Sequence, residues 1–314
     1  MSHDLGAGTE MSQVTIVEVG PRDGFQSVGP FIPTPAKIEI VQALYEAGLR
    51  RMEATSFVNP TAVPQLQDAS DVLAAAGRLP DLDAQVLVPT LRQTERALAA
   101  GSTHLAFVLS VSERHNRSNV RRSPAESGED YARILALLPA GAKMRLNVAT
   151  AFDCPYDGPV DPDRTIALLD QLAPLSIDAE IALCDTTGRV TPRHVESLFG
   201  IVMARFPRHR WAFHAHDTYG LGAANTLAAW NAGVRTFDAS IGGLGGCPFA
   251  PGATGNVATE DLVWMFHGMG IGTGIDLAAL VAVARKVAVL PGAQIGGRVR
   301  DAITSRTRIA AEAA

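Results

Sequence analysis

Two histidines lie one residue apart in an apolar segment, WAFHAHDTYG, at residues 211–220. If this segment is a β-strand, His214 and His216 lie on the same face, because side chains of a strand alternate between its two faces. Two neutral imidazoles on one face form a natural pair of metal ligands. The alternative is a pair of buried core histidines, and the spacing alone favours it. A metal site therefore needs further ligands elsewhere in the chain.

Two other segments supply candidate ligands. Asp23 lies in EVGPRDGFQ, and Asn256 ends the glycine-rich segment GGLGGCPFAPGATGN. With the two histidines they form a mixed set of nitrogen and oxygen ligands, which suits Mg2+ or Mn2+ with positions left open for water or substrate. The alternatives are an ordinary turn aspartate, since RDG is common in turns, and an ordinary loop asparagine. The cysteines have no spacing that indicates a zinc site.

Arg22 and Cys247 add groups that can take part in a reaction. Arg22 directly precedes Asp23, so its guanidinium would lie beside the metal, where a fixed cation stabilises a developing enolate oxygen. The alternative is a solvated arginine in a surface turn. Cys247 lies among glycines, which allow a loop to approach a ligand closely and to move. The alternatives are an inert buried thiol or a loop that binds phosphate.

The segments that must position these residues alternate between two hydrophobic patterns. Short apolar runs predict strands, and the amphipathic stretches between them predict helices. Eight strand-helix units within about 270 residues predict a (β/α)8 TIM barrel, with extra C-terminal helices from about residue 276 onward. The alternative is a doubly wound open sheet, although no GxGxxG motif follows the first strand. The predicted strands are 14–19, 51–57, 84–89, 104–110, 144–152, 180–185, 211–217 and 234–241, and the predicted helices include 34–48, 61–76, 92–100, 161–173, 191–206 and 218–232.

Polar residues fall where a TIM barrel places its chemistry, at the carboxyl ends of the strands. Asp185 ends the sixth predicted strand, and Glu53 lies within the second. His214 and His216 lie at the end of the seventh strand. The other candidates follow the first and eighth strands: Arg22, Asp23, Cys247 and Asn256. The pattern predicts one active site at this end of the barrel.

Composition excludes several other classes of protein. The formal net charge of the 314 residues is −5, which argues against nucleic-acid binding, and no apolar run reaches the roughly 18 residues of a membrane span. Three distant cysteines without a CxxC pair argue against disulfides and indicate a cytoplasmic protein. We expect a disordered N-terminal lead at 1–12 and a single catalytic domain at 13–314. The basic run RHNRSNVRR (114–122) is either a solvated surface or a contact for substrate phosphates.

Four longer motifs resemble a known family. VEVGPRDGFQ, EATSFVNP, HAHDTYG and GGLGGCPFAPGATGNVATEDLV are similar to those of hydroxymethylglutaryl-CoA lyases, metal-dependent TIM-barrel lyases related to isopropylmalate and homocitrate synthases. The resemblance covers residues 14–290 and implies a homo-oligomer, a homodimer or larger, that cleaves an acyl-CoA thioester with Mg2+ or Mn2+. It implies metal ligands at Asp23, His214, His216 and Asn256. It also implies that Arg22 faces the substrate carbonyl and that Cys247 lies on a mobile loop. Glu53 and Asp185 match acidic residues of the family's site.

Some residues depart from the pattern of these lyases. The chain has Phe25 where the family usually has leucine, and Phe152 and Asp153 precede Cys154 where the lyases often read CALGCPYEG. Phe25 is expected to line the substrate pocket. The substrate is therefore either hydroxymethylglutaryl-CoA or a related thioester such as citramalyl-CoA. A Claisen-condensing synthase, which typically reads HxHND where this chain reads HAHDT, and a non-catalytic barrel that binds metal or CoA are further alternatives.

Overall fold

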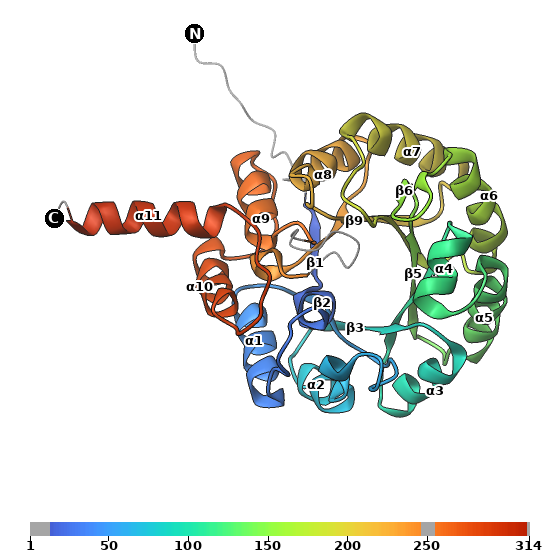
Figure 1. The fold of residues 1–314 in the computed structure, drawn as a ribbon, viewed down its shortest axis with the longest axis horizontal. Coiled ribbons are helices and arrows are strands. Elements are labelled where there is room, and N and C mark those ends of the chain that lie inside the picture. The colour runs from blue at the N-terminus through green and yellow to red at the C-terminus, as the bar shows by residue number, and fades with distance from the viewer. Residues whose placement is uncertain (1–12, 246–254, 313–314) are drawn as a thin grey trace, which may run out of the picture.

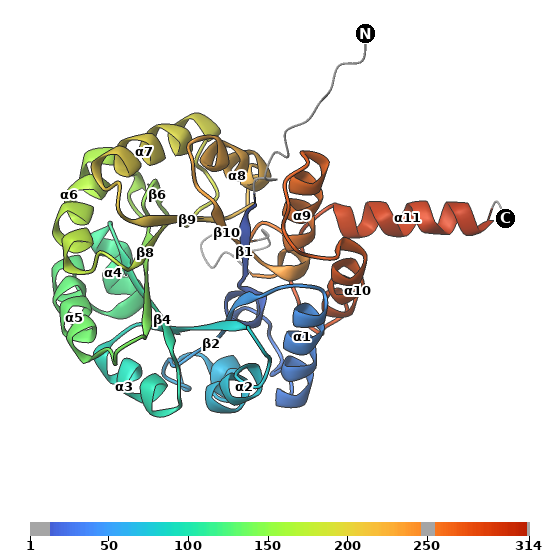
Figure 2. The same ribbon diagram turned by 180° about the vertical axis from the view of Figure 1, so that it is seen from behind.

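Eight parallel strands form a closed barrel in the computed structural model, which describes residues 13–245 and 255–312. β1 pairs with β2 on one side and with β10 on the other, which closes the ring. Helices surround the strands on the outside (Figures 1 and 2). The predicted (β/α)8 TIM barrel is confirmed. The barrel strands are β1 (Thr15–Glu18), β2 (Arg51–Ser56), β3 (Asp83–Val88), β4 (His104–Ser110), β5 (Lys143–Ala149), β8 (Glu180–Asp185), β9 (Arg210–Ala215) and β10 (Thr236–Ala239).

Most helices between the strands lie where the hydrophobic periodicity predicts them, but two begin later. α2 begins at Ala69 rather than near residue 61, because Pro64 has no N–H to donate and opens a separate short 3-10 helix. α8 begins at Gly222 rather than 218, since Gly220 has a φ of +76° that a helix does not allow. The outer helices are α1 (Thr34–Glu46), α2 (Ala69–Ala76), α3 (Leu91–Ala99), α6 (Pro162–Leu172), α7 (Pro192–Arg205), α8 (Gly222–Asn231) and α9 (Thr259–Gly268).

Two features at the carboxyl end of the barrel are more elaborate than the sequence indicates. The basic run forms its own helix, α4 (Glu113–Val120), which ends where Arg121 adopts a left-handed φ of 59°. A capping box between Ser123 and Glu126 then starts α5 (Pro124–Leu137). A small hairpin of β6 (Asp153–Cys154) and β7 (Gly158–Pro159) follows β5.

The C-terminal helices lie outside the barrel, as predicted. α10 (Leu277–Ala288) packs beside α1 and α9, and α11 (Val299–Glu312) extends away from the body of the molecule (Figures 1 and 2). Within the two described ranges, no helix has both the length and the apolar character that crossing a membrane requires.

The interior of the barrel contains charged side chains, whereas the space between strands and helices is apolar. The outer layer includes fully buried side chains such as Leu44, Phe199 and Phe266. Arg145 on β5 bonds Asp238 on β10, and these strands are not neighbours in the ring, so the contact crosses the lumen. The hydrophobic layer therefore holds the barrel together, while its lumen remains available for polar chemistry.

Candidate active site

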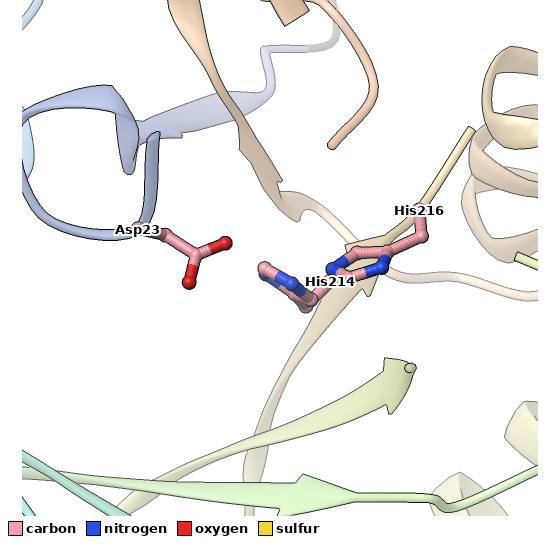
Figure 3. A group of neighbouring side chains, drawn as sticks. All are labelled: Asp23, His214 and His216. Carbon is pink, nitrogen blue, oxygen red and sulfur yellow. The ribbon is translucent and has the colours of Figure 1, made fainter. Parts of the chain in front are cut away.

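Three predicted metal ligands converge at the carboxyl end of the barrel. Asp23 follows β1, His214 lies on β9, and His216 lies just beyond the end of that strand (Figure 3). One ligand atom from each residue lies within 4.8 Å of the other two, and the two imidazole centroids are 5.1 Å apart. One carboxylate and two imidazoles at these separations fit a divalent cation that keeps further positions open.

The loop after β1 places Asp23 by means of a tight turn. Gly20–Gly24 form a single turn of π-helix, η1, in which the Val19 carbonyl accepts hydrogen bonds from the N–H groups of Arg22 and Asp23, at 3.1 and 2.7 Å. Gly24 allows η1 to pack against the chain that follows β10, because a Cβ there would lie 2.8 Å from Cβ of Leu244. The motif GPRDG thus brings Asp23 toward the histidines.

Hydrogen bonds determine which imidazole nitrogens are free. Nδ1 of His214 lies 3.0 Å from Oδ2 of Asp238, which leaves Nε2 available. Asp238 raises the pKa of His214 above its ordinary value, although burial opposes the charge. Nδ1 of His216 is buried and has no hydrogen-bond partner within the described residues. Burial and the neighbouring His214 lower the pKa of His216 to about 4, so its ring is neutral near pH 7 and able to bind a metal.

Arg22 joins the metal-site carboxylate to a second acid. Its Nη1 donates to Oδ1 of Asp23 and its Nε donates to Oε2 of Glu53, each at 2.5 Å. Burial opposes ionisation of both carboxyls, yet the Arg22 guanidinium and the two imidazoles hold the pKa of Asp23 well below its usual range. For Glu53, burial prevails and the pKa is raised. The site thus contains a fixed cation beside an ionised carboxylate.

Asn256 contacts Asp23 through its amide nitrogen. Nδ2 donates to Oδ2 of Asp23 at 2.7 Å and to the carbonyl oxygen of Leu244 at 3.0 Å. In this arrangement the amide holds the carboxylate in place, and a ligand role for its oxygen stays a prediction. Cys247 lies outside the described residues, so its role also stays a prediction.

Asp185 combines burial with an unused oxygen. It ends β8 and pairs with Ala215, the residue before His216, in the register of β8 and β9. Its Oδ1 accepts a hydrogen bond from the N–H of Gly188 at 2.9 Å, whereas Oδ2 has no partner in the part of the chain that the structure describes. Burial raises the pKa of Asp185 to about 7, the range in which a carboxyl group can both accept and donate a proton.

Glu18 and Asp238 support the site, and the sequence interpretation did not single them out. Glu18 accepts hydrogen bonds from the N–H groups of Gly20 and Ile241, at 2.7 and 2.8 Å, and from the Thr259 hydroxyl at 2.7 Å. It therefore ties η1 to the segment before the glycine-rich loop. The sequence does contain a signal for both residues, an acidic side chain inside an otherwise apolar strand. The segment is VTIVEV for Glu18 and TFDAS for Asp238.

The residues that depart from the lyase pattern lie partly in the hydrophobic core and partly beside the candidate site. Phe25 is fully buried in the hydrophobic core, so the expectation that it lines a substrate pocket is wrong. Phe152 also packs in the core, in edge-to-face contact with Phe213. Asp153 accepts a hydrogen bond from the Thr187 hydroxyl at 2.8 Å, and its charge contributes to the raised pKa of Asp185. Of these three departures, Asp153 alone acts on a candidate site residue.

Comparisons with known proteins agree with the barrel fold and indicate one family. The HMGL-like family model matches residues 13–287. Mitochondrial hydroxymethylglutaryl-CoA lyase from Mus musculus is 44% identical over 87% of this chain and 84% of its own, and (R)-citramalyl-CoA lyase from Chloroflexus aurantiacus is 40% identical over 87% and 90%. A crystal structure of hydroxymethylglutaryl-CoA lyase from Pseudomonas aeruginosa is 36% identical and has a TM-score of 0.88, covering 95% of this chain and 100% of that one.

Proposed function

The chain belongs to the HMGL-like family and is an acyl-CoA lyase, and we propose that it cleaves hydroxymethylglutaryl-CoA to acetyl-CoA and acetoacetate with a divalent cation. The observation that carries this proposal is the convergence of Asp23, His214 and His216 beside Arg22. Retro-Claisen cleavage needs both a Lewis acid for the hydroxyl group and a cation for the enolate, and this arrangement can supply both.

The proposed metal set is Asp23, His214 and His216, with Asn256 as a further ligand. An ionised carboxylate and neutral imidazole nitrogens are the forms that bind a metal, and the low pKa values of Asp23 and His216 favour them. A bound Mg2+ or Mn2+ would lower the pKa of the substrate hydroxyl group, a stabilisation worth several kcal/mol.

The protein's own residues then divide the remaining work. Asp185 accepts the proton of the C3 hydroxyl group, and the O–H electrons form the new carbonyl of the keto acid. The C2–C3 bond breaks, and its electrons pass to the thioester oxygen as an enolate that Arg22 stabilises. Cys247 then delivers a proton to C2, which gives acetyl-CoA. Glu53 holds the Arg22 guanidinium in this orientation through the contact at 2.5 Å.

A second substrate has specific support. The citramalyl-CoA lyase from Chloroflexus aurantiacus is similar over nearly the same share of this chain as the hydroxymethylglutaryl-CoA lyase from mouse. Citramalyl-CoA has the same tertiary hydroxyl group but one methylene fewer before its carboxylate. The same chemistry would therefore release pyruvate in place of acetoacetate.

One assay tests the function and separates the two substrates. Purified protein is incubated with each thioester, with Mg2+ or with EDTA, and the keto acid and acetyl-CoA are followed by mass spectrometry. We expect metal-dependent formation of acetyl-CoA with acetoacetate. Turnover only of citramalyl-CoA would replace the proposed substrate, and full turnover in EDTA would refute the proposed metal dependence.

We also propose that the protein acts as a homodimer. Support comes from the family resemblance. Light scattering of the purified protein measures the mass directly, and a single species at the monomer mass of 33.1 kDa would refute this proposal.

A further inference from the structure

A chain of alternating charges leads to one of the candidate metal ligands. Arg51 forms two hydrogen bonds with Glu180, at 2.9 and 2.6 Å, and Glu180 lies 3.4 Å from Nη1 of Arg145. Nη2 of Arg145 donates to both oxygens of Asp238, each at 2.8 Å. Oδ2 of Asp238 accepts from Nδ1 of His214 at 3.0 Å. The side chains come from five different strands, β2, β8, β5, β10 and β9.

The chain lies inside the barrel and is nearly inaccessible to water. The side chain of Arg145 is 1% exposed, and those of Glu180 and Asp238 are each 5% exposed. Buried charges at such positions keep their ionisation only when each has an opposite charge as partner. Arg145 has two such partners, and Nε of its guanidinium also donates to Asn147 at 2.8 Å. Asp238 is therefore held in one orientation by a rigid and permanently charged donor.

The donor and acceptor roles in this chain determine the protonation of His214. A guanidinium can only donate hydrogen bonds, and an ionised carboxylate can only accept them. Asp238, ionised by its contact with Arg145, therefore needs a proton on Nδ1 of His214. In the neutral imidazole the proton is then absent from Nε2, which keeps its lone pair.

We propose that Asp238, oriented by Arg145, is a positioning residue that makes Nε2 of His214 the metal-binding nitrogen. This inference rests on the proposed metal-dependent function, since it gives His214 a ligand role. Asp238 also compensates the charge of Arg145, which would otherwise repel a divalent cation at the adjacent site. Partners of this kind around a metal ligand typically change metal affinity by 10–100-fold when they are replaced.

Asp238→Asn tests the tautomer with the smallest change in shape. The asparagine oxygen would turn toward Arg145, because a guanidinium cannot accept a hydrogen bond, and the amide NH2 would face His214. The imidazole would then have to accept on Nδ1 and hold its proton on Nε2, the nitrogen needed for the metal. We expect Mn2+ affinity, measured by calorimetry or by electron paramagnetic resonance, to fall about 10–100-fold.

Asp83→Asn is a matched control inside the same barrel. Asp83 on β3 accepts from Nδ1 of His104 at 2.8 Å, so it makes the same kind of carboxylate-imidazole pair. Within the described residues, its ion pair with the charge chain is the one between its Oδ2 and Nε of Arg51, at 3.9 Å. We expect the control variant to bind Mn2+ with wild-type affinity. Equal affinities in the wild type and both variants would overturn the inference. Absence of Mn2+ binding by the wild type would instead overturn the metal site and, with it, the proposed function.

The tautomer of His214 can also be measured directly, without a metal. Nitrogen-15 NMR of histidine side chains distinguishes the Nδ1–H from the Nε2–H tautomer, and His214→Gln identifies the signal. At alkaline pH we expect the wild-type His214 to show the Nδ1–H tautomer and Asp238→Asn to shift it toward Nε2–H. An Nε2–H tautomer in the wild type would overturn the inference, even if Asp238→Asn fails to fold.

Discussion

Ionisation of Asp185 should make the free energy of unfolding of this protein depend on pH, and replacement of Asp185 should remove that dependence. Burial raises the pKa of this carboxyl from its ordinary value of 3.8 to about 7. Between those pH values the native state holds a proton that the unfolded chain has lost. The contribution of Asp185 to stability is therefore fully present below pH 4 and is lost as the pH rises to 7.

The size of the effect follows from the shift. The pKa rises by roughly three pH units, and each unit corresponds to about 1.4 kcal/mol, so the free energy of unfolding falls by about 4 kcal/mol across this range. Asp185→Asn cannot ionise and escapes this loss. The new amide places a donor where Oδ2 has no partner among the described residues, which costs about 1–3 kcal/mol at every pH. That cost lowers the free energy of unfolding of the variant by the same amount at every pH, so it does not change how stability depends on pH.

Urea unfolding of both proteins at several pH values between 4 and 8 measures the difference. We expect the variant to gain stability relative to the wild type, by up to about 4 kcal/mol, as the pH rises. If Asp185 is also the base, kcat/KM of the wild type rises with pH up to about 7, and the variant loses about 10²–10⁴-fold in rate. Parallel stability curves would show that Asp185 ionises normally and would refute the argument for its role.

Three further substitutions test the other proposed roles. Arg22→Met should keep Mn2+ affinity but lower kcat by about 10²–10³-fold, because it removes the cation for the enolate; a near-normal kcat in steady-state assays would remove Arg22 from the mechanism. His216→Ala should lose Mn2+ affinity and activity together, as calorimetry and the lyase assay will show, and full metal binding would contradict its ligand role. Cys247→Ala should lower kcat by about 10²–10⁴-fold while Mn2+ affinity stays at the wild-type level; a fall in that affinity would place the thiol at the metal instead.

The sequence predicts the barrel well because each of its signals is local. A buried parallel strand is a short apolar run and an outer helix is amphipathic, so both patterns can be read within about ten residues. The prediction of a strand at 84–89 differs from Asp83–Val88 by one residue at each end. Closure of the ring then brings the end of β1 near the end of β9, which explains why Asp23 could be matched with two histidines almost 200 residues away.

The contacts that cross the lumen could not be predicted in this way. Whether Arg145 meets Asp238 depends on strand tilt and register around the whole barrel, and neither is encoded in a local pattern. The error at Phe25 has a similar origin. Phe25 follows the RDG motif, and this position predicts that its side chain lines the substrate pocket. The tight turn of η1 instead directs the side chain into the hydrophobic core.

The charged lumen is best explained by the site above it. Replacing a buried ion pair by apolar side chains of similar volume is often neutral or stabilises a protein by about 1–4 kcal/mol, so the contacts among Arg51, Glu180 and Arg145 are a weak source of stability. Their order suggests a different origin. Nδ1 of His214 needs a hydrogen-bond acceptor, which is Asp238, and Asp238 needs a neighbouring cation to stay ionised, which is Arg145. Glu180 then compensates the charge of Arg145, and Arg51 compensates that of Glu180. If so, apolar replacement of Arg51 and Glu180 together should cost metal affinity more than it costs stability.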